Sequence, residues 1–233
     1  MNIKKCYSFP PPGTDLSNLS GLLIVIEGPD SSGRSTQIRL IKTWLEEKGY
    51  AVDEVGLKRS LLVGPALEQA KEGNVLSPRT MSLFYATDFY DQLENRIVPA
   101  LRAGCIVLAD RYIFTLIARD TVRGGDPEWV TSLYSMAIVP DAVFFIMSSC
   151  KTLMERTFQS HGCLDYWESG MDIGISRDWH ESFIRYQNKM RAEYKKLQTK
   201  YGFEIINGNC SIKAINIELQ ARIQMVLERN LKI

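Results

Sequence analysis

The chain has 233 residues, of which 45% are hydrophobic and 24% charged, with a formal net charge of +1. These values are typical of one globular domain and exclude a strongly basic surface for nucleic acid or membranes, so we expect a small anionic ligand held by local charge. The five cysteines are scattered without metal-binding spacing, and two histidines are too few for a histidine metal site or a catalytic triad.

No segment approaches the roughly 18 consecutive apolar residues of a membrane span. Residues 1–20 lack the apolar core of a signal peptide and contain the run Pro10-Pro11-Pro12-Gly13. We therefore expect an N-terminal arm over residues 1–20, either extended or frayed, followed by a single domain over residues 21–233. Reduced thiols and the missing signal core predict a cytoplasmic protein.

The remaining chain alternates between two patterns. Short runs, most of them apolar and rich in β-branched residues, predict strands at 22–26, 51–55, 105–109, 142–147 and 203–206. Helical spacing predicts helices at 37–45, 66–73, 81–101 (broken or ended near Pro99), 129–137, 151–158, 180–201 and 212–230. This alternation predicts an α/β fold, a three-layer arrangement with a parallel sheet of about five strands between helices.

One motif lies between the first strand and the first helix. Residues 28–36 read Gly-Pro-Asp-Ser-Ser-Gly-Arg-Ser-Thr, close to the phosphate-binding pattern of glycine, four free positions, glycine, lysine and serine or threonine. Backbone N–H groups of such a loop and the start of the following helix bind pyrophosphate, and the serine hydroxyl can coordinate Mg²⁺. The candidate residues for binding ATP are Gly28, Ser31, Ser32, Gly33, Arg34, Ser35 and Thr36.

Arg34 stands where the motif has lysine. Arginine can bind phosphate, but its long planar fork does not replace a compact ammonium group at a fitted site. The motif therefore predicts nucleotide binding more firmly than catalysis.

A second group of polar residues ends the strand at 105–109. Because ligands of parallel sheets collect at the carboxyl ends of strands, Asp110 and Arg111 are expected to lie near the phosphate loop. Asp110 could act around Mg²⁺ or orient a substrate, and Arg111 could clamp a phosphate. The alternative is an ion pair with a purely structural role.

Several segments of the chain resemble those of thymidylate kinases, a family in the P-loop nucleoside monophosphate kinase group. They include the loop and the strand end, and they follow the order of the family along residues 21–210. The matching segments are residues 26–37, 76–80, 83–86, 99–104, 110–112, 125–130, 140–141 and 164–168. The resemblance implies transfer of the γ-phosphoryl group of ATP to dTMP with Mg²⁺, in a homodimer with contacts from the helix that begins near Met81.

The resemblance also implies roles for single residues. The expected catalytic residues are Asp30, Arg34, Arg111 and Arg177. The expected substrate-binding residues are Asp30, Phe84 (stacked on the base), Asp88, Arg111, Arg119 and Trp167. Ser35 and Asp110 would hold the metal, and a lid at about residues 159–178 would cover ATP.

The departures from the family pattern concentrate on the acceptor side. Asp88 stands where the family has an acceptor-facing arginine, Arg119 and Asp120 replace an aromatic and a small polar residue, and Tyr166 replaces a lid arginine. Three hypotheses follow: a thymidylate kinase with an altered site, a kinase for another nucleotide or small acceptor, and a catalytically weak protein that binds nucleotide for regulation or assembly.

Overall fold

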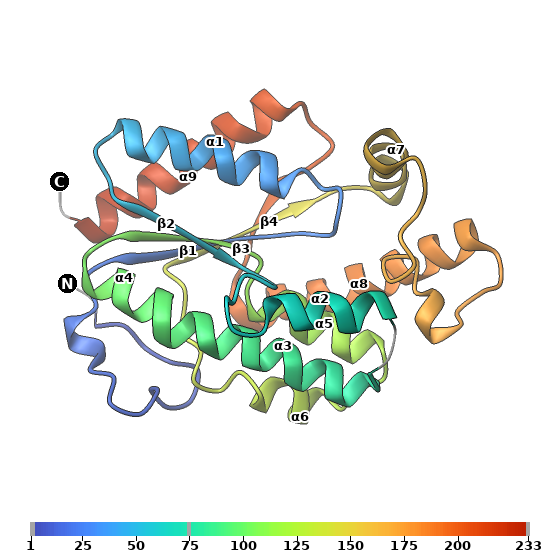
Figure 1. Ribbon diagram of the computed structural model, residues 1–233. Coiled ribbons are helices and arrows are strands. Elements are labelled where there is room, and N and C mark those ends of the chain that lie inside the picture. Colours follow the sequence, from blue (N-terminus) through green and yellow to red (C-terminus); the bar gives the residue numbers. More distant parts are fainter. Residues whose placement is uncertain (1–2, 74–75, 232–233) are drawn as a thin grey trace.

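The computed structural model describes residues 3–73 and 76–231. Five parallel strands form one sheet in the order β2-β3-β1-β4-β5 (Figure 1). The strands are β1 Leu22–Glu27, β2 Val52–Gly56, β3 Ile106–Asp110, β4 Ala142–Met147 and β5 Glu204–Asn207. The predicted α/β fold, its parallel sheet and its number of strands are confirmed.

Helices cover both faces of the sheet. Alternate residues of β1 point to opposite sides: Leu22, Ile24 and Ile26 pack in the cluster formed with α1 Arg34–Glu47 and α9 Ile212–Leu231. Leu23 and Val25 belong to a larger cluster on the other face. A strand covered on both sides is mostly apolar, and every residue of β1 is buried, the first five of them apolar.

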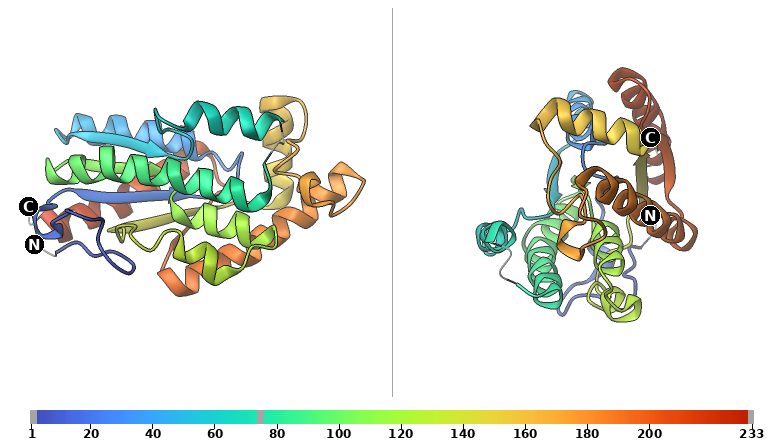
Figure 2. Two further views of the ribbon diagram at one scale, coloured as in Figure 1. Left: turned by 60° about the horizontal axis from the view of Figure 1, so that its bottom comes forward. Right: turned by 90° about the vertical axis from the view of Figure 1, so that its right-hand side faces the viewer.

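The helices on the second face form most of the ligand cavity described below. They are α2 Gly64–Gly73, α3 Pro78–Gln92, α4 Val98–Arg102, α5 Ile113–Val122, α6 Pro127–Ser132 and α8 Trp179–Tyr201, while α7 Cys150–His161 lies near the phosphate loop. Figure 2 shows α7 and the segment after it at the end of the molecule opposite the two termini. Within the described part of the chain, none of the helices combines the length and apolar character needed to cross a membrane.

Three helices differ from the sequence expectation. The helix predicted over 81–101 is interrupted by a π-helical turn at Leu93–Ile97 and continues through Pro99 to Arg102. The wider turn ends two residues before Pro99, which has no N–H to donate. Helix α5 covers a segment with no predicted element, because its first six residues are all buried and show no polar face. Helix α6 ends at Ser132, five residues before the predicted end.

The segment before the sheet lies against the domain. Lys4 forms a buried ion pair with Asp141, and Asp141 also accepts a hydrogen bond of 2.8 Å from the N–H of Leu23 in β1. The ring of Tyr7 makes an edge contact with Tyr201 at 5.2 Å between centroids. The pair of Lys4 and Asp141 lies beside the start of β1, at the opposite end of that strand from the phosphate loop.

Candidate active site

The phosphate loop depends on two glycines. Gly28 has a φ of +151°, and a Cβ there would lie 2.8 Å from the carbonyl oxygen of Ile146 and 2.9 Å from Oγ of Ser32. Gly33 has a φ of +93° and is the N-cap of α1. A larger side chain at either position would be strained, so the loop can turn its backbone toward a ligand only with glycine here.

Arg34 points back into this loop. Its Nη1 donates hydrogen bonds to the carbonyl oxygens of Gly28 and, at 2.6 Å, of Pro29. Its Nε donates to Asp110 at 3.0 Å, and its Nη2 lies 3.4 Å from Asp30. With a side chain only 7% exposed, Arg34 commits most of its donors to the protein itself.

Asp110 lies directly beneath the start of α1. The hydroxyl of Ser35 donates to its Oδ2 at 3.1 Å, so the two proposed metal ligands are neighbours. Nη2 of Arg59, in the loop after β2, lies 3.6 Å from the same oxygen. Arg59 therefore reaches the strand end, whereas its neighbour Lys58 pairs with Glu68 of α2.

A cluster of charges forms around Asp30 of the phosphate loop. Its carboxylate pairs with Arg111 and, at 2.6 Å, with Nη2 of Arg119. Nε of Arg111 is buried without a hydrogen-bond partner, and its backbone has a strained φ of +70°. Burial, and next the charge of Arg119, lower the pKa of Arg111 to about 10, so it remains cationic at neutral pH. A strained cationic residue with a free donor is typical of a binding site.

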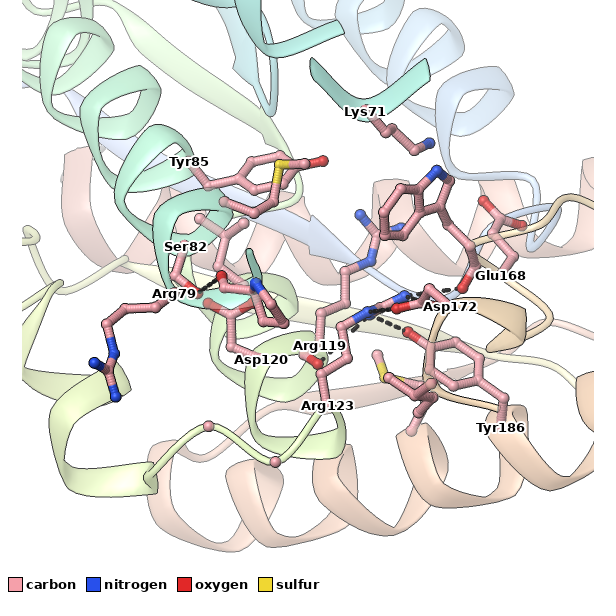
Figure 3. Close-up of a pocket in the computed structure, with 18 of the residues that line it drawn as sticks. Lys71, Arg79, Ser82, Tyr85, Arg119, Asp120, Arg123, Glu168, Asp172 and Tyr186 are labelled. Carbon is pink, nitrogen blue, oxygen red and sulfur yellow. Dashed lines mark hydrogen bonds and ion pairs between the residues drawn. The ribbon is translucent and has the colours of Figure 1, made fainter. Parts of the chain in front are cut away.

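A cavity of about 540 Å³ opens from this cluster. Its walls come from α2, α3, α5, the α5–α6 turn, the segment before α8, and α8 itself. Figure 3 shows side chains of α3 on one side, those of the 167–172 segment and α8 on the other, and the arginines of α5 and its C-terminus between them. The volume suits a nucleotide or other small ligand.

Two predicted acceptor residues lie outside the cavity lining. Phe84 packs against the hydrophobic cluster, whereas its neighbour Tyr85 lines the cavity. Asp88 is fully buried and accepts hydrogen bonds from the N–H groups of Lys58 at 2.8 Å and Ser60 at 2.9 Å. Burial raises the pKa of Asp88. It shapes the loop after β2 and presents no charge to the acceptor.

The predicted lid forms one wall of the cavity. Trp167 and Glu168 line it, and burial raises the pKa of Glu168. Arg123, the C-cap of α5, donates to Asp172 at 2.7 Å and to the carbonyl oxygen of Trp167 at 2.9 Å. These contacts join the lid to α5. Arg177 is exposed and does not line the cavity.

A buried network supports the floor of the site. Glu27, at the end of β1, accepts hydrogen bonds from the N–H of Tyr112 at 2.9 Å and from the hydroxyl of Thr115 at 2.5 Å. The Thr115 hydroxyl also lies 2.8 Å from that of Tyr194, which lines the cavity. Burial raises the pKa of Glu27, although these bonds partly oppose the shift. The network fixes the start of α5, and thereby Arg119, relative to the sheet.

The amino-acid sequence of this chain is similar to those of known proteins. The family model described as thymidylate kinase matches residues 26–219, from β1 into α9. The chain belongs to the thymidylate kinase family. It is 36% identical over 203 residues to a probable thymidylate kinase 2 of Saccharolobus solfataricus, covering 87% of this chain and 95% of the relative. It is 30% identical to a probable thymidylate kinase of Thermococcus onnurineus, and the match covers 87% of this chain and 97% of the relative. It is also 30% identical to a probable thymidylate kinase of Thermococcus gammatolerans, and this match covers 85% of this chain and 94% of the relative.

The thymidylate kinase resemblance stated from the sequence is thus confirmed, and ATP use follows from the family. The cavity residues that were not among the sequence candidates include Lys71, Tyr85 and Arg123. Tyr85 differs from the proposed Phe84 by one position on α3, a helical rotation that aromatic identity alone cannot resolve. Lys71 lies in the last turn of α2 with no motif beside it, and Arg123 lies between Arg119 and the matching segment at 125–130 without belonging to either.

Proposed function

We propose that this chain transfers the γ-phosphoryl group of ATP to dTMP, giving dTDP. The observation that carries the proposal is the cavity that opens at the mouth of the phosphate loop, with Asp30, Arg111 and Arg119 at the junction. Phosphoryl transfer requires two substrates in line with their charges neutralised, and little covalent chemistry. A donor loop and an acceptor cavity that meet at arginines meet this requirement, and the named relatives support dTMP as the acceptor.

The residues near the loop fit Mg²⁺. Mg²⁺ prefers oxygen ligands and uses one or two carboxylates together with water and substrate phosphates. Ser35 and Asp110 offer a hydroxyl and a carboxylate 3.1 Å apart, and the described residues contain no group of three or more acidic, histidine or cysteine side chains that could hold a metal alone. When bound, the ion would neutralise charge on the phosphate oxygens.

The other side chains would position the acceptor. Arg111 and Arg119 would hold its phosphate at the end of the cavity next to the loop, and Tyr85 and Trp167 offer aromatic surface for the base. Glu168 and Asp172 belong to a wall that Arg123 fastens to α5, which would keep water from the transferred group. Arg177 would have to move inward to act as a catalytic residue.

A catalytically weak nucleotide-binding protein is the second candidate, favoured by one observation. The donors of Arg34 are directed at loop carbonyls and carboxylates rather than at the space above the loop.

We also propose a homodimer with contacts from α3, and cytoplasmic residence, both by analogy with the family. Sedimentation of the purified chain tests the first, and localisation of a tagged full-length chain tests the second.

A coupled assay of ADP release tests the function. The purified chain is given ATP, Mg²⁺ and one nucleoside monophosphate from a panel that contains dTMP, dUMP, dCMP, dAMP and dGMP. Selective turnover of dTMP supports the proposal, and selective turnover of another acceptor assigns a different kinase activity. Thermal stabilisation by ATP without turnover of any acceptor would establish the weak nucleotide-binding protein instead. Ser35→Ala provides the control for metal-dependent turnover.

A further inference from the structure

Arg34 contacts both sides of the site. Its Nε lies 3.0 Å from Oδ1 of Asp110, beside the hydroxyl of Ser35, and its Nη2 lies 3.4 Å from Oδ1 of Asp30. Nη1 holds the group in place through the carbonyl oxygens of Gly28 and Pro29. Only a planar fork with donors on three nitrogens can make these contacts together, whereas an ammonium group is a single point of charge.

The two carboxylates differ in how firmly they hold Arg34. Asp30 has two closer partners, Arg111 and Arg119, and its contact with Arg34 is the longest of the three. Asp110 has Arg34 as its closest cation, because Arg59 lies farther away at 3.6 Å. In the structure the guanidinium group therefore leans toward Asp110, the carboxylate beside the start of α1.

An acceptor phosphate would change this balance. Arg111 and Arg119 line the acceptor cavity, so a phosphate bound there competes with Asp30 for both guanidinium groups. Asp30 then keeps Arg34 as its remaining cation. A stronger attraction to Asp30 draws the guanidinium group of Arg34 away from Asp110, and an oxygen of Asp110 becomes free for a metal ion.

We propose that Arg34 is a positioning residue that couples the two substrate subsites, so that an acceptor phosphate at Arg111 and Arg119 strengthens binding of the Mg²⁺-nucleotide at the loop. This inference rests on the proposed function, because it assigns the cavity to the acceptor and the loop to the donor. Coupling of this kind is reciprocal: the Mg²⁺-nucleotide strengthens acceptor binding by the same factor. It also gives the arginine a role that the lysine of the usual motif could not fill.

Calorimetric titration tests the coupling without turnover. The full chain is titrated with the Mg²⁺ complex of adenylyl imidodiphosphate, with and without saturating dTMP, and the ratio of the two dissociation constants is the readout. We expect the wild-type chain to bind the nucleotide at least about fivefold more tightly with dTMP present. Arg34→Lys should bring the ratio to within about twofold of unity, because lysine cannot contact both carboxylates. Arg39→Lys, an exposed substitution on the same helix, should keep the wild-type ratio.

A ratio that survives in Arg34→Lys, or a wild-type ratio near unity, overturns the inference. Thermal melting establishes that each variant is folded, and Asp30→Asn, which removes the other end of the link, decides the matter if Arg34→Lys does not fold. Its expected ratio is also near unity. If the wild-type chain does not bind dTMP, the proposed acceptor is wrong, and the same titration with inorganic phosphate in place of dTMP still measures the coupling. Turnover of dTMP with a ratio of unity would leave the proposed function standing and remove the coupling alone.

Discussion

The phosphate loop and the cavity beside it are assembled in opposite ways. The loop takes its shape from nine consecutive residues, 28–36, with glycines at the two positions where the backbone requires them. The cavity instead takes single side chains from helices and turns that lie far apart in the sequence (Figure 3). A local motif can be identified in a sequence, whereas a cavity of this kind exists only after the helices have packed.

This difference also concerns what each region can tolerate. The loop depends on backbone geometry, so a substitution there should change nucleotide binding and stability together. The cavity depends on charges and surfaces of side chains, so a substitution there should change acceptor kinetics and leave donor binding intact. Four experiments examine this separation.

Arg111→Gln should have the largest effect. It removes a cation from the junction between the loop and the cavity, and the loss of one such donor costs roughly 100-fold to 1,000-fold in rate. We expect the loss in kcat/KM for the acceptor and no loss of affinity for the Mg²⁺-nucleotide alone. An equal loss in nucleotide affinity would show that the two regions are not separate.

Gly28→Ala should damage the loop itself. The added Cβ would lie 2.8 Å from a backbone oxygen at a φ of +151°, and such strain costs about 1–3 kcal/mol of unfolding free energy. Urea unfolding and nucleotide titration measure both consequences. Gly13→Ala is the matched control, because that glycine also has a positive φ but open space around it. Equal effects of the two substitutions would contradict a steric role for Gly28.

Tyr85→Leu and Phe84→Leu together test the aromatic wall. Tyr85 lines the cavity and Phe84 packs beside it, so we expect KM for the acceptor to rise by about fivefold to tenfold with the first substitution, or about 1 kcal/mol of lost aromatic contact. Phe84→Leu should change the same KM by less than about twofold. A larger effect of Phe84→Leu would restore the interpretation from the sequence.

Glu27→Gln should have the smallest effect on catalysis, and its effect on stability depends on pH. Burial raises the pKa of Glu27, so the stability it contributes is complete below its ordinary value of 4.5 and is lost as the pH rises through the raised value. The wild-type chain should therefore lose unfolding free energy relative to the variant as the pH rises from about 4.5 through the raised pKa, by about 1.4 kcal/mol for each unit of the shift. Urea unfolding measures the trend. Exposed Glu47→Gln should show none of it.

Much of the fold could be predicted because apolar strands and amphipathic helices leave clear patterns. The prediction missed helix α5. Its first six residues are all buried, so the sequence there shows no alternation between apolar and polar residues at helical spacing. The candidate site could likewise be predicted only in part. Ser35 and Asp110 were placed correctly beside each other by the rule that ligands collect at strand ends, although their binding of a metal stays a prediction.

The sequence by itself determined the alternation of strands and helices apart from α5, the phosphate loop and the resemblance to thymidylate kinases. Each of these features depends on short segments whose residues are close together in the chain. Only the tertiary structure decided that Tyr85 rather than Phe84 lines the cavity, that Asp88 binds backbone amides, and that Arg34 lies between Asp30 and Asp110. The direction of a side chain and the identity of its charged neighbours depend on how separate helices and strands pack, and no local pattern encodes that information.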